Sequence, residues 1–181
     1  LRIALTAKVL NPNITMAIKS TTKNHTENLQ DLGVQTIENP FEIIANHIHM
    51  SINTPNTLRL VRWVYGLCNL YDPLMSLPRG KYIVCGYGRM GKSIYEVLKQ
   101  NDFDIGFAEI NGEKMKHLSS HERQMVRIGD GDDRELLKEL GIESCVGIIA
   151  GTDDDTSNLS ILSTARKLNP SIITIARENE L

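Results

Sequence analysis

A short apolar run leads directly into three glycines at a fixed spacing, and this feature constrains the fold more than any other in the sequence. Residues 82–85 read Tyr-Ile-Val-Cys, typical of a buried parallel strand, and a GxGxxG pattern and a helical pattern follow. Gly86 allows a tight turn, Gly88 lets the backbone approach a pyrophosphate, and Gly91 permits close packing of helix on strand. The first N–H groups of the helix would then face the phosphates. The alternative interpretation is a glycine-rich turn that binds nothing.

An acidic residue follows at the distance that this pattern requires. Glu109 ends the second predicted strand, 18 residues after Gly91. A carboxylate at this position can accept hydrogen bonds from both hydroxyls of an adenosine ribose, and it would repel a 2′-phosphate. The sequence therefore favours NAD(H) or ADP/ATP over NADP as the ligand.

Predicted strands and helices alternate from Lys81 onward. The expected strands are 81–85, 104–110, 124–128, 145–150 and 172–176, and the expected helices are 91–100, 112–119, 133–140 and 156–168. This alternation predicts an α/β fold with a Rossmann-type, doubly wound parallel sheet.

Two further loops follow predicted strands, where a doubly wound sheet places its ligand contacts. Asp130 and Gly131 follow the third strand, and Thr152 and Asp153 follow the fourth. For Asp130 and Thr152, ligand contact and helix capping both remain open, since a side-chain oxygen in a first turn can satisfy unpaired N–H groups.

Other acidic residues in these loops are interpreted differently. Asp133 and Asp155 are predicted to cap helices, because a carboxylate there also suits the helix dipole. Carboxylates on two adjacent loops could also hold Ca²⁺, which prefers oxygen ligands. No EF-hand spacing is present, so no residue is assigned as a metal ligand.

A repeat relates the two ends of the chain. Aligning Asn11-Pro12 with Asn169-Pro170 brings eight identical residues into register at an offset of 158. In both copies a helical pattern ends at the Asn, Pro prevents its continuation, and a β-rich run follows. A period this long predicts duplication of a whole domain. The predicted parts are the C-terminal half of a first copy (1–66), a linker (67–80) and the N-terminal part of a second copy (81–181).

The first part has its own predicted elements. These are helices over 1–10, 24–32, 41–52 and 58–67, and strands over 14–19 and 34–38. The two halves either complement each other or belong to two incomplete lobes. Because Leu1 falls within a helical pattern, the chain is expected to be a fragment of something larger.

Composition narrows the function classes. Residues 81–181 hold 13 of the 20 Lys+Arg and 17 of the 22 Asp+Glu. A mildly acidic domain without a basic stripe predicts no nucleic-acid partner. Three widely spaced cysteines without a CxxC pair favour reduced thiols in the cytosol. The sequence contains no run of 18 apolar residues, so no membrane span is predicted.

Together these patterns resemble the TrkA-N or RCK (regulator of potassium conductance) domain family. The resemblance rests on the glycine pattern, the strand ending at Glu109, and the segments 129–132, 148–153 and 165–170. Residues 1–66 resemble the later half of another copy, including the family's crossover helix. The resemblance implies a regulatory domain on the cytoplasmic face of the cell membrane that binds NAD(H), ADP or ATP. It also implies that the domain gates a membrane-embedded potassium channel or transporter and forms homo-oligomers through the crossover helix.

The resemblance also assigns site residues. The phosphates would lie along Gly86, Gly88, Arg89, Met90 and Gly91; the ribose would lie beside Glu109, where the family usually has Asp; and the far side would be formed by Asp130, Gly131, Thr152 and the adjacent Asp153.

The competing function is an NAD-dependent oxidoreductase, because the same fold supports it. Such an enzyme would need a substrate domain and a general acid or base near the nicotinamide. No Ser-Tyr-Lys or His-Asp pattern is visible in the sequence. A non-enzymatic sensor without catalytic residues is therefore predicted.

Overall fold

The computed structural model describes residues 1–99 and 103–179, in two units, Leu1–Ile44 and Ala45–Leu181. The predicted end of one helix at Gln100 lies outside the described residues. Within the described part, none of the helices combines the length and the apolar character needed to cross a membrane.

The first unit pairs two short parallel strands with two helices. Its elements in chain order are α1 (Arg2–Leu10), β1 (Ala17–Lys19), α2 (Lys23–Asp31) and β2 (Thr36–Glu38). Ile18 of β1 lies beside Ile37 of β2 in a two-stranded sheet. The buried residues of this unit's core are Ala4, Met16, Leu29 and Val34. Its strands are thus paired with each other, and they form a sheet of their own.

Two helices follow the first sheet. α3 (Pro40–Asn53) runs from the first unit into the second, and α4 (Pro55–Val64) begins after a single residue. Pro55 starts α4 because proline lacks the N–H needed to continue α3 but fits the first turn of a new helix. Residues 65–81, which include the predicted linker, form neither helix nor strand.

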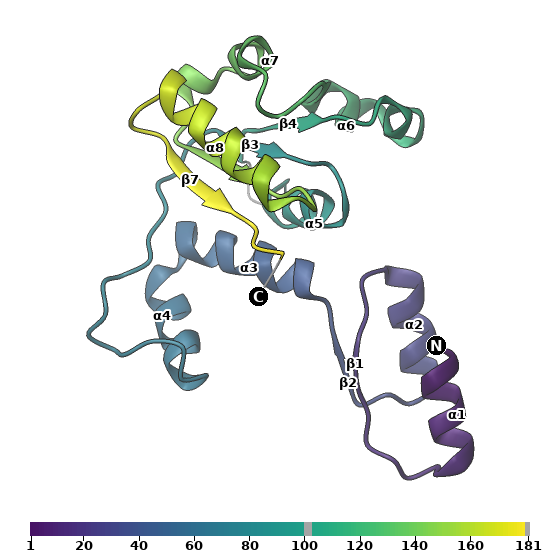
Figure 1. Cartoon of the computed structure of the whole chain (residues 1–181). Helices are drawn as coiled ribbons and strands as arrows, with labels where there is room; N and C mark the ends of the chain where they lie inside the picture. The colour runs from purple at the N-terminus through teal and green to yellow at the C-terminus, as the bar shows by residue number, and fades with distance from the viewer. Residues whose placement is uncertain (100–102, 180–181) are drawn as a thin grey trace. The chain divides into compact units, whose positions relative to one another are not determined.

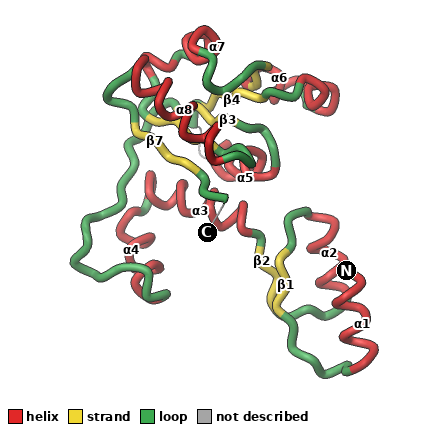
Figure 2. Tube along the Cα trace, in the orientation of Figure 1, coloured by secondary structure: helices red, strands yellow, loops and turns green. Residues whose placement is uncertain are grey.

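The second unit contains a five-stranded parallel sheet (Figures 1 and 2). Its strands in chain order are β3 (Tyr82–Cys85), β4 (Ile105–Glu109), β5 (Val126–Ile128), β6 (Gly147–Ala150) and β7 (Ile173–Ala176). Their spatial order is β5-β4-β3-β6-β7, so the chain builds outward from β3 to one edge and then returns to the other side. This order confirms the predicted Rossmann-type fold. It also creates a switch point between β3 and β6.

Helices connect the strands of this sheet. They are α5 (Arg89–Leu98), the 3₁₀ helix η2 (Gly112–His117), α6 (Ser120–Met125), α7 (Arg134–Glu139), the 3₁₀ helix η3 (Ile142–Ser144) and α8 (Asp155–Leu168). The prediction of one helix over 112–119 is wrong, because η2 ends at His117 and a new helix, α6, begins. Ser119 starts α6 through a capping box, in which its hydroxyl accepts the N–H of Glu122 and the Glu122 carboxylate accepts the N–H of Ser119.

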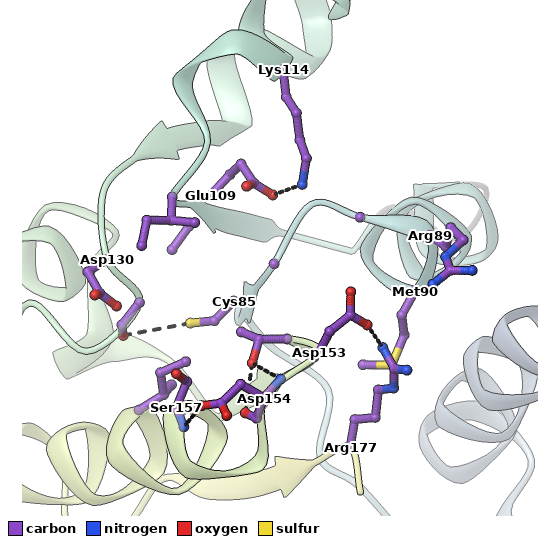
Figure 3. A pocket seen from close by; sticks show the side chains of 18 residues that line it. Cys85, Arg89, Met90, Glu109, Lys114, Asp130, Asp153, Asp154, Ser157 and Arg177 are labelled. Atoms are coloured by element: carbon purple, nitrogen blue, oxygen red, sulfur yellow. Dashed lines mark hydrogen bonds and ion pairs between the residues drawn. The ribbon is translucent and has the colours of Figure 1, made fainter. Parts of the chain in front are cut away.

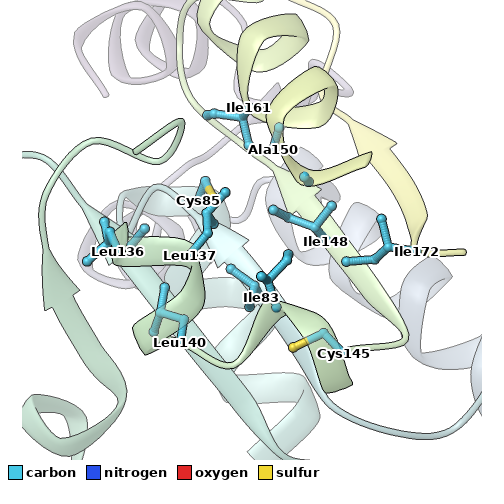
Figure 4. Packing of buried hydrophobic residues seen from close by; sticks show 13 residues of the cluster. Ile83, Cys85, Leu136, Leu137, Leu140, Cys145, Ile148, Ala150, Ile161 and Ile172 are labelled. Carbon is cyan, nitrogen blue, oxygen red and sulfur yellow. The ribbon is translucent and has the colours of Figure 1, made fainter. Parts of the chain in front are cut away.

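Both faces of the three central strands of the sheet, β3, β4 and β6, are buried. Ile83 and Cys85 belong to a cluster with residues of α7, η3, β6 and α8 (Figure 4). Tyr82 and Val84, which alternate with them along β3, are buried as well. Burial on both faces explains why these central strands read as continuous apolar runs.

The two Asn-Pro segments share one local geometry. Asn11 and Asn169 are extended, at φ −144° and −137°, and they donate their backbone N–H groups to Ala7 and Ala165 respectively. Each Asn side chain also accepts a hydrogen bond from the backbone N–H two residues later. The sequence repeat therefore has a structural counterpart at these helix ends, while duplication of a whole domain stays a prediction.

Candidate functional site

A cavity of about 400 Å³ opens where β3, β4 and β6 end, beside the first turn of α5 (Figure 3). Doubly wound folds bind ligands at this switch point, in pockets of roughly 300–1,000 Å³. The predicted site residues that line the cavity are Gly86, Gly88, Arg89, Met90, Glu109, Asp130, Gly131, Thr152 and Asp153. Gly91 is the one predicted site residue that does not line it.

The three glycines after β3 meet different steric demands. Gly86 has φ +101°, and a Cβ there would lie 3.2 Å from the carbonyl oxygen of Gly151. A Cβ on Gly91 would lie 2.1 Å from the carbonyl oxygen of Gly86, so Gly91 serves close packing. Among the described residues other than its two chain neighbours, none has an atom within 4 Å of a Cβ placed on Gly88, which caps α5 without a side-chain hydrogen bond. This leaves open space beside helix N–H groups that favour an anion.

Glu109 is a buried carboxylate at the edge of the cavity, with 3% of its surface exposed. Its Oε2 accepts hydrogen bonds from the backbone N–H of Tyr87 and from Nζ of Lys114, both at 2.8 Å. Its Oε1 accepts one from the N–H of Asn111 at 2.9 Å. Burial raises the pKa of Glu109, but these three donors outweigh burial and hold the pKa below its ordinary value. The side chain is therefore an ionised acceptor in a fixed position.

Residues of the loop after β5 have two different roles: one caps a helix, and two others line the cavity. Asp133 caps α7, because its carboxylate accepts the N–H groups two and three residues later, and this prediction is confirmed. Asp130 does not cap the helix and lies at the cavity. Gly131 is packed tightly, since a Cβ there would lie 3.0 Å from Sγ of Cys85.

Asn158 fixes the loop after β6. It is 1% exposed, and its Oδ1 accepts the backbone N–H of Thr152 at 3.0 Å and the Thr152 hydroxyl at 2.8 Å. Its Nδ2 donates to the carbonyl oxygens of Thr152 and Arg177, at 3.3 and 3.0 Å. One buried side chain thus holds Thr152 at the cavity and ties the loop to the segment that follows β7.

The first turn of α8 corrects one capping prediction. Asp154 caps the helix, because its carboxylate accepts the N–H of Ser157. Asp155 was expected to do so, but it is the first helical residue, and its carboxylate accepts hydrogen bonds from Asn179. The chain enters the helix one residue earlier than the charge pattern suggested.

Two arginines line the cavity. Arg89 begins α5 and Arg177 follows β7, and both line the cavity. Arg177 forms an ion pair with Asp153 (Figure 3). Arg89 and the N-terminus of α5 favour an anion beside Gly88, whereas four carboxylates, those of Glu109, Asp130, Asp153 and Asp154, line the rest of the cavity.

Two cationic lining residues were not predicted, Arg177 and Lys114. Arg177 had a signal, since it directly follows the last strand at the edge of the sheet where ligands bind. No sequence pattern marked Lys114 as a cavity residue, because Lys114 reaches Glu109 only after η2 folds back toward β4.

The acidic residues of these loops do not converge on a metal site. Among residues 1–99 and 103–179, no three His, Cys, Asp or Glu side chains come together in a way that could hold a metal ion. The suggestion that Ca²⁺ binds here stays a prediction.

The sequence matches known potassium transport proteins. Residues 82–181 match the family model described as the TrkA-N domain. Probable potassium channel protein 2 of Methanocaldococcus jannaschii is 33% identical over 101 residues, which cover 55% of this chain and 29% of that protein. A Trk system potassium uptake protein TrkA homolog of Pyrococcus abyssi is 30% identical over 95 residues, covering 52% and 42% respectively. The chain thus spans less than half the length of these relatives.

The fold of nearly the whole chain is found in solved structures. The crystal structure of GsuK bound to ADP has a TM-score of 0.70 over 97% of this chain and 39% of that one, at 19% identity. The crystal structure of the GsuK RCK domain has a TM-score of 0.67 over 97% of this chain and 51% of that one, at 16% identity. At these identities the similarity is one of fold, and the fold is that of an RCK domain.

Proposed function

This chain belongs to the TrkA-N domain family, and from that premise we propose that it is a regulatory domain that binds an adenine nucleotide in the cavity beside Gly88. The proposed ligands are ADP, ATP or NAD(H). Ligand binding would control a potassium channel or transporter at the cytoplasmic face of the cell membrane. The names of the curated relatives support potassium transport, and the ADP in one GsuK structure supports the ligand class.

The observation that carries the proposal is the pairing of open space over Gly88 with the buried carboxylate of Glu109 on the next strand. An adenine nucleotide presents phosphates at one end and a ribose diol a short distance away. The α5 N-terminus offers N–H groups and positive dipole to the phosphates, and Glu109 offers acceptors to the diol. Both features line a single cavity of suitable volume.

The remaining lining residues fit the same ligand. Arg89 lies where it can neutralise phosphate charge, and Arg177 can do so by exchanging its ion pair with Asp153 for one with a phosphate. Ile110 lines the cavity and is 71% exposed, which gives an apolar surface for the adenine ring. The residues present therefore suit a nucleotide at each of its three parts.

No catalytic role is proposed for this cavity. Its described lining contains no His or Tyr that could serve as general acid or base beside a nicotinamide. Burial, followed by the charges of Asp130 and Asp132, raises the pKa of the Cys85 thiol to about 12, so a reactive thiolate is disfavoured. An NAD-dependent oxidoreductase is therefore the weaker candidate.

The oligomer and the domain arrangement belong to the same proposal. We place subunit pairing on the crossover helix and its continuation, α3 and α4. Exposed apolar side chains on and after α4 support this, namely Leu60, Trp63, Val64, Tyr65, Leu67, Leu70 and Tyr71. We also propose that residues 1–66 and 81–181 are parts of two domain copies joined by the linker 67–80. Sedimentation of the chain should detect a dimer.

Thermal unfolding of the chain with ADP, ATP, NAD and NADH tests ligand binding. At 100 times its dissociation constant, a ligand of the folded state should stabilise it by about 2.7 kcal/mol. Potassium flux in cells that produce the chain tests regulation, and it should differ between wild type and Gly88→Val. Unchanged unfolding temperatures with all four nucleotides at millimolar concentration would refute the proposed ligand class.

A further inference from the structure

We propose that Lys114 competes with the ribose of the ligand for the carboxylate of Glu109, and that it thereby weakens the preference of this site for ribose over deoxyribose. The inference rests on the proposed function, since it concerns the ribose end of the same cavity. It assigns a specificity-determining role to a residue outside the glycine loop.

The ion pair between these two side chains lies at the cavity itself. Nζ of Lys114 is 2.8 Å from Oε2 of Glu109, and both residues line the cavity (Figure 3). The Glu109 side chain is 4% exposed, whereas that of Lys114 is 41% exposed. The acid is thus buried in the protein, while the cation has access to water.

The Glu109 carboxylate has too few acceptor positions for both Lys114 and a ribose diol. An ionised carboxylate has about four lone-pair positions, two on each oxygen. On Oε2, both are taken by the N–H of Tyr87 and by Lys114, and on Oε1 one is taken by the N–H of Asn111. One position on Oε1 remains. A ribose diol that donates two hydrogen bonds to Glu109 therefore needs the position that Lys114 holds.

The geometry determines which partner must leave. Tyr87 and Asn111 donate from the backbone, next to β3 and β4, and cannot withdraw without displacing the loops that carry them. Lys114 reaches Glu109 through a flexible side chain that is half in water. A ligand with one sugar hydroxyl can use the remaining position on Oε1. A ligand with two sugar hydroxyls must displace Lys114. The binding free energy that its second hydroxyl contributes is therefore reduced by the loss of the ion pair between Lys114 and Glu109.

The test compares ADP with 2′-deoxy-ADP on the full chain by isothermal titration calorimetry. The two ligands share base and phosphates, so the ratio of their dissociation constants isolates the 2′-hydroxyl. Lys114→Met removes the competing cation and keeps an unbranched side chain. We expect it to raise the preference for ADP over 2′-deoxy-ADP by about 3- to 10-fold relative to wild type.

Two variants control this comparison. Lys116→Met removes a cation from the same turn that pairs with Glu113 and does not line the cavity, so it should leave the ratio unchanged. Lys114→Arg keeps the positive charge and should keep the ratio close to that of wild type.

The outcomes separate this inference from the proposed function. If neither nucleotide binds wild type or any variant, both fail together. If both nucleotides bind and Lys114→Met leaves the ratio unchanged or lowers it, Lys114 does not compete with the ribose and the inference alone is overturned. A raised ratio that Lys116→Met reproduces would also overturn it, because the effect would then reflect net charge.

Discussion

Gly91 lies so close to Gly86 that a Cβ atom on Gly91 would be 2.1 Å from the Gly86 carbonyl oxygen. Gly88, between them, lines the cavity, and apart from its chain neighbours no residue in the described part of the chain comes within 4 Å of the corresponding position. One loop therefore holds a glycine required by packing and a glycine that leaves room for a ligand.

Gly91→Ala should destabilise the protein. The new methyl group would overlap a backbone carbonyl, which cannot rotate away as a side chain can, and overpacking of this kind costs about 1–3 kcal/mol. Urea unfolding followed by circular dichroism measures the change. Gly88→Ala is the matched control, and its free energy of unfolding should stay close to that of wild type. Equal stability of Gly91→Ala and wild type would contradict the packing role.

Tyr87→Phe should weaken the attachment of α6 to the glycine loop. The Tyr87 hydroxyl donates to Oε1 of Glu122 at 2.5 Å, and the tyrosine is 1% exposed. Loss of this hydrogen bond should lower the free energy of unfolding by about 1 kcal/mol at pH 7. Denaturant titration measures the difference, and Tyr95→Phe, in the neighbouring helix α5, is the control.

The same hydrogen bond should make stability depend on pH in the acidic range. Hydrogen bonds from Ser119 and then from Tyr87 lower the pKa of Glu122 from its ordinary value of 4.5 to about 2. The stabilisation is therefore complete above pH 4.5 and is lost as the pH falls toward 2. The difference in stability between wild type and Tyr87→Phe should shrink over this range. A difference that is constant from pH 6 to pH 2 would show that the charge of Glu122 plays no part.

Asn158→Ala should affect both stability and ligand binding. The side chain makes four hydrogen bonds to Thr152 and Arg177 while almost fully buried. Its removal leaves backbone groups unpaired and should cost about 2–4 kcal/mol. Because Thr152 lines the cavity, ADP affinity should fall as well. Asn158→Asp keeps the acceptor for Thr152 but turns a buried carboxylate oxygen toward the carbonyl oxygens of Thr152 and Arg177, so at pH 7 it should be no more stable than Asn158→Ala.

The parts of this structure that were predictable from sequence depend on local pattern. The glycine loop, the acid at the end of β4 and the parallel sheet follow from spacing and from apolar runs, since each needs a particular residue at a particular step of the chain. The start of α6 was also readable, because Ser119 and Glu122 form a capping box, but the expectation of one helix over 112–119 concealed it.

Other features depend on tertiary contacts, which local sequence patterns do not encode. Lys114 pairs with Glu109 only because η2 turns back toward β4, and no periodicity encodes that approach. Asp154 and Asp155 are chemically equivalent caps, and the entry of the chain into α8 selects between them. Side-chain contacts across a cavity and the register of a cap are decided by packing, which a single sequence does not display.

Calorimetric titration of the 181-residue chain with ADP and with NAD tests the central claim most directly, when wild type is compared with Gly88→Val. The valine side chain would enter the open space at the start of α5, where no described residue other than the two chain neighbours has an atom within 4 Å of its Cβ position, so the fold should persist. The account predicts saturable binding of at least one nucleotide by wild type and a loss of affinity of about 10-fold or more in Gly88→Val. Equal nucleotide affinity in the two folded proteins would contradict it.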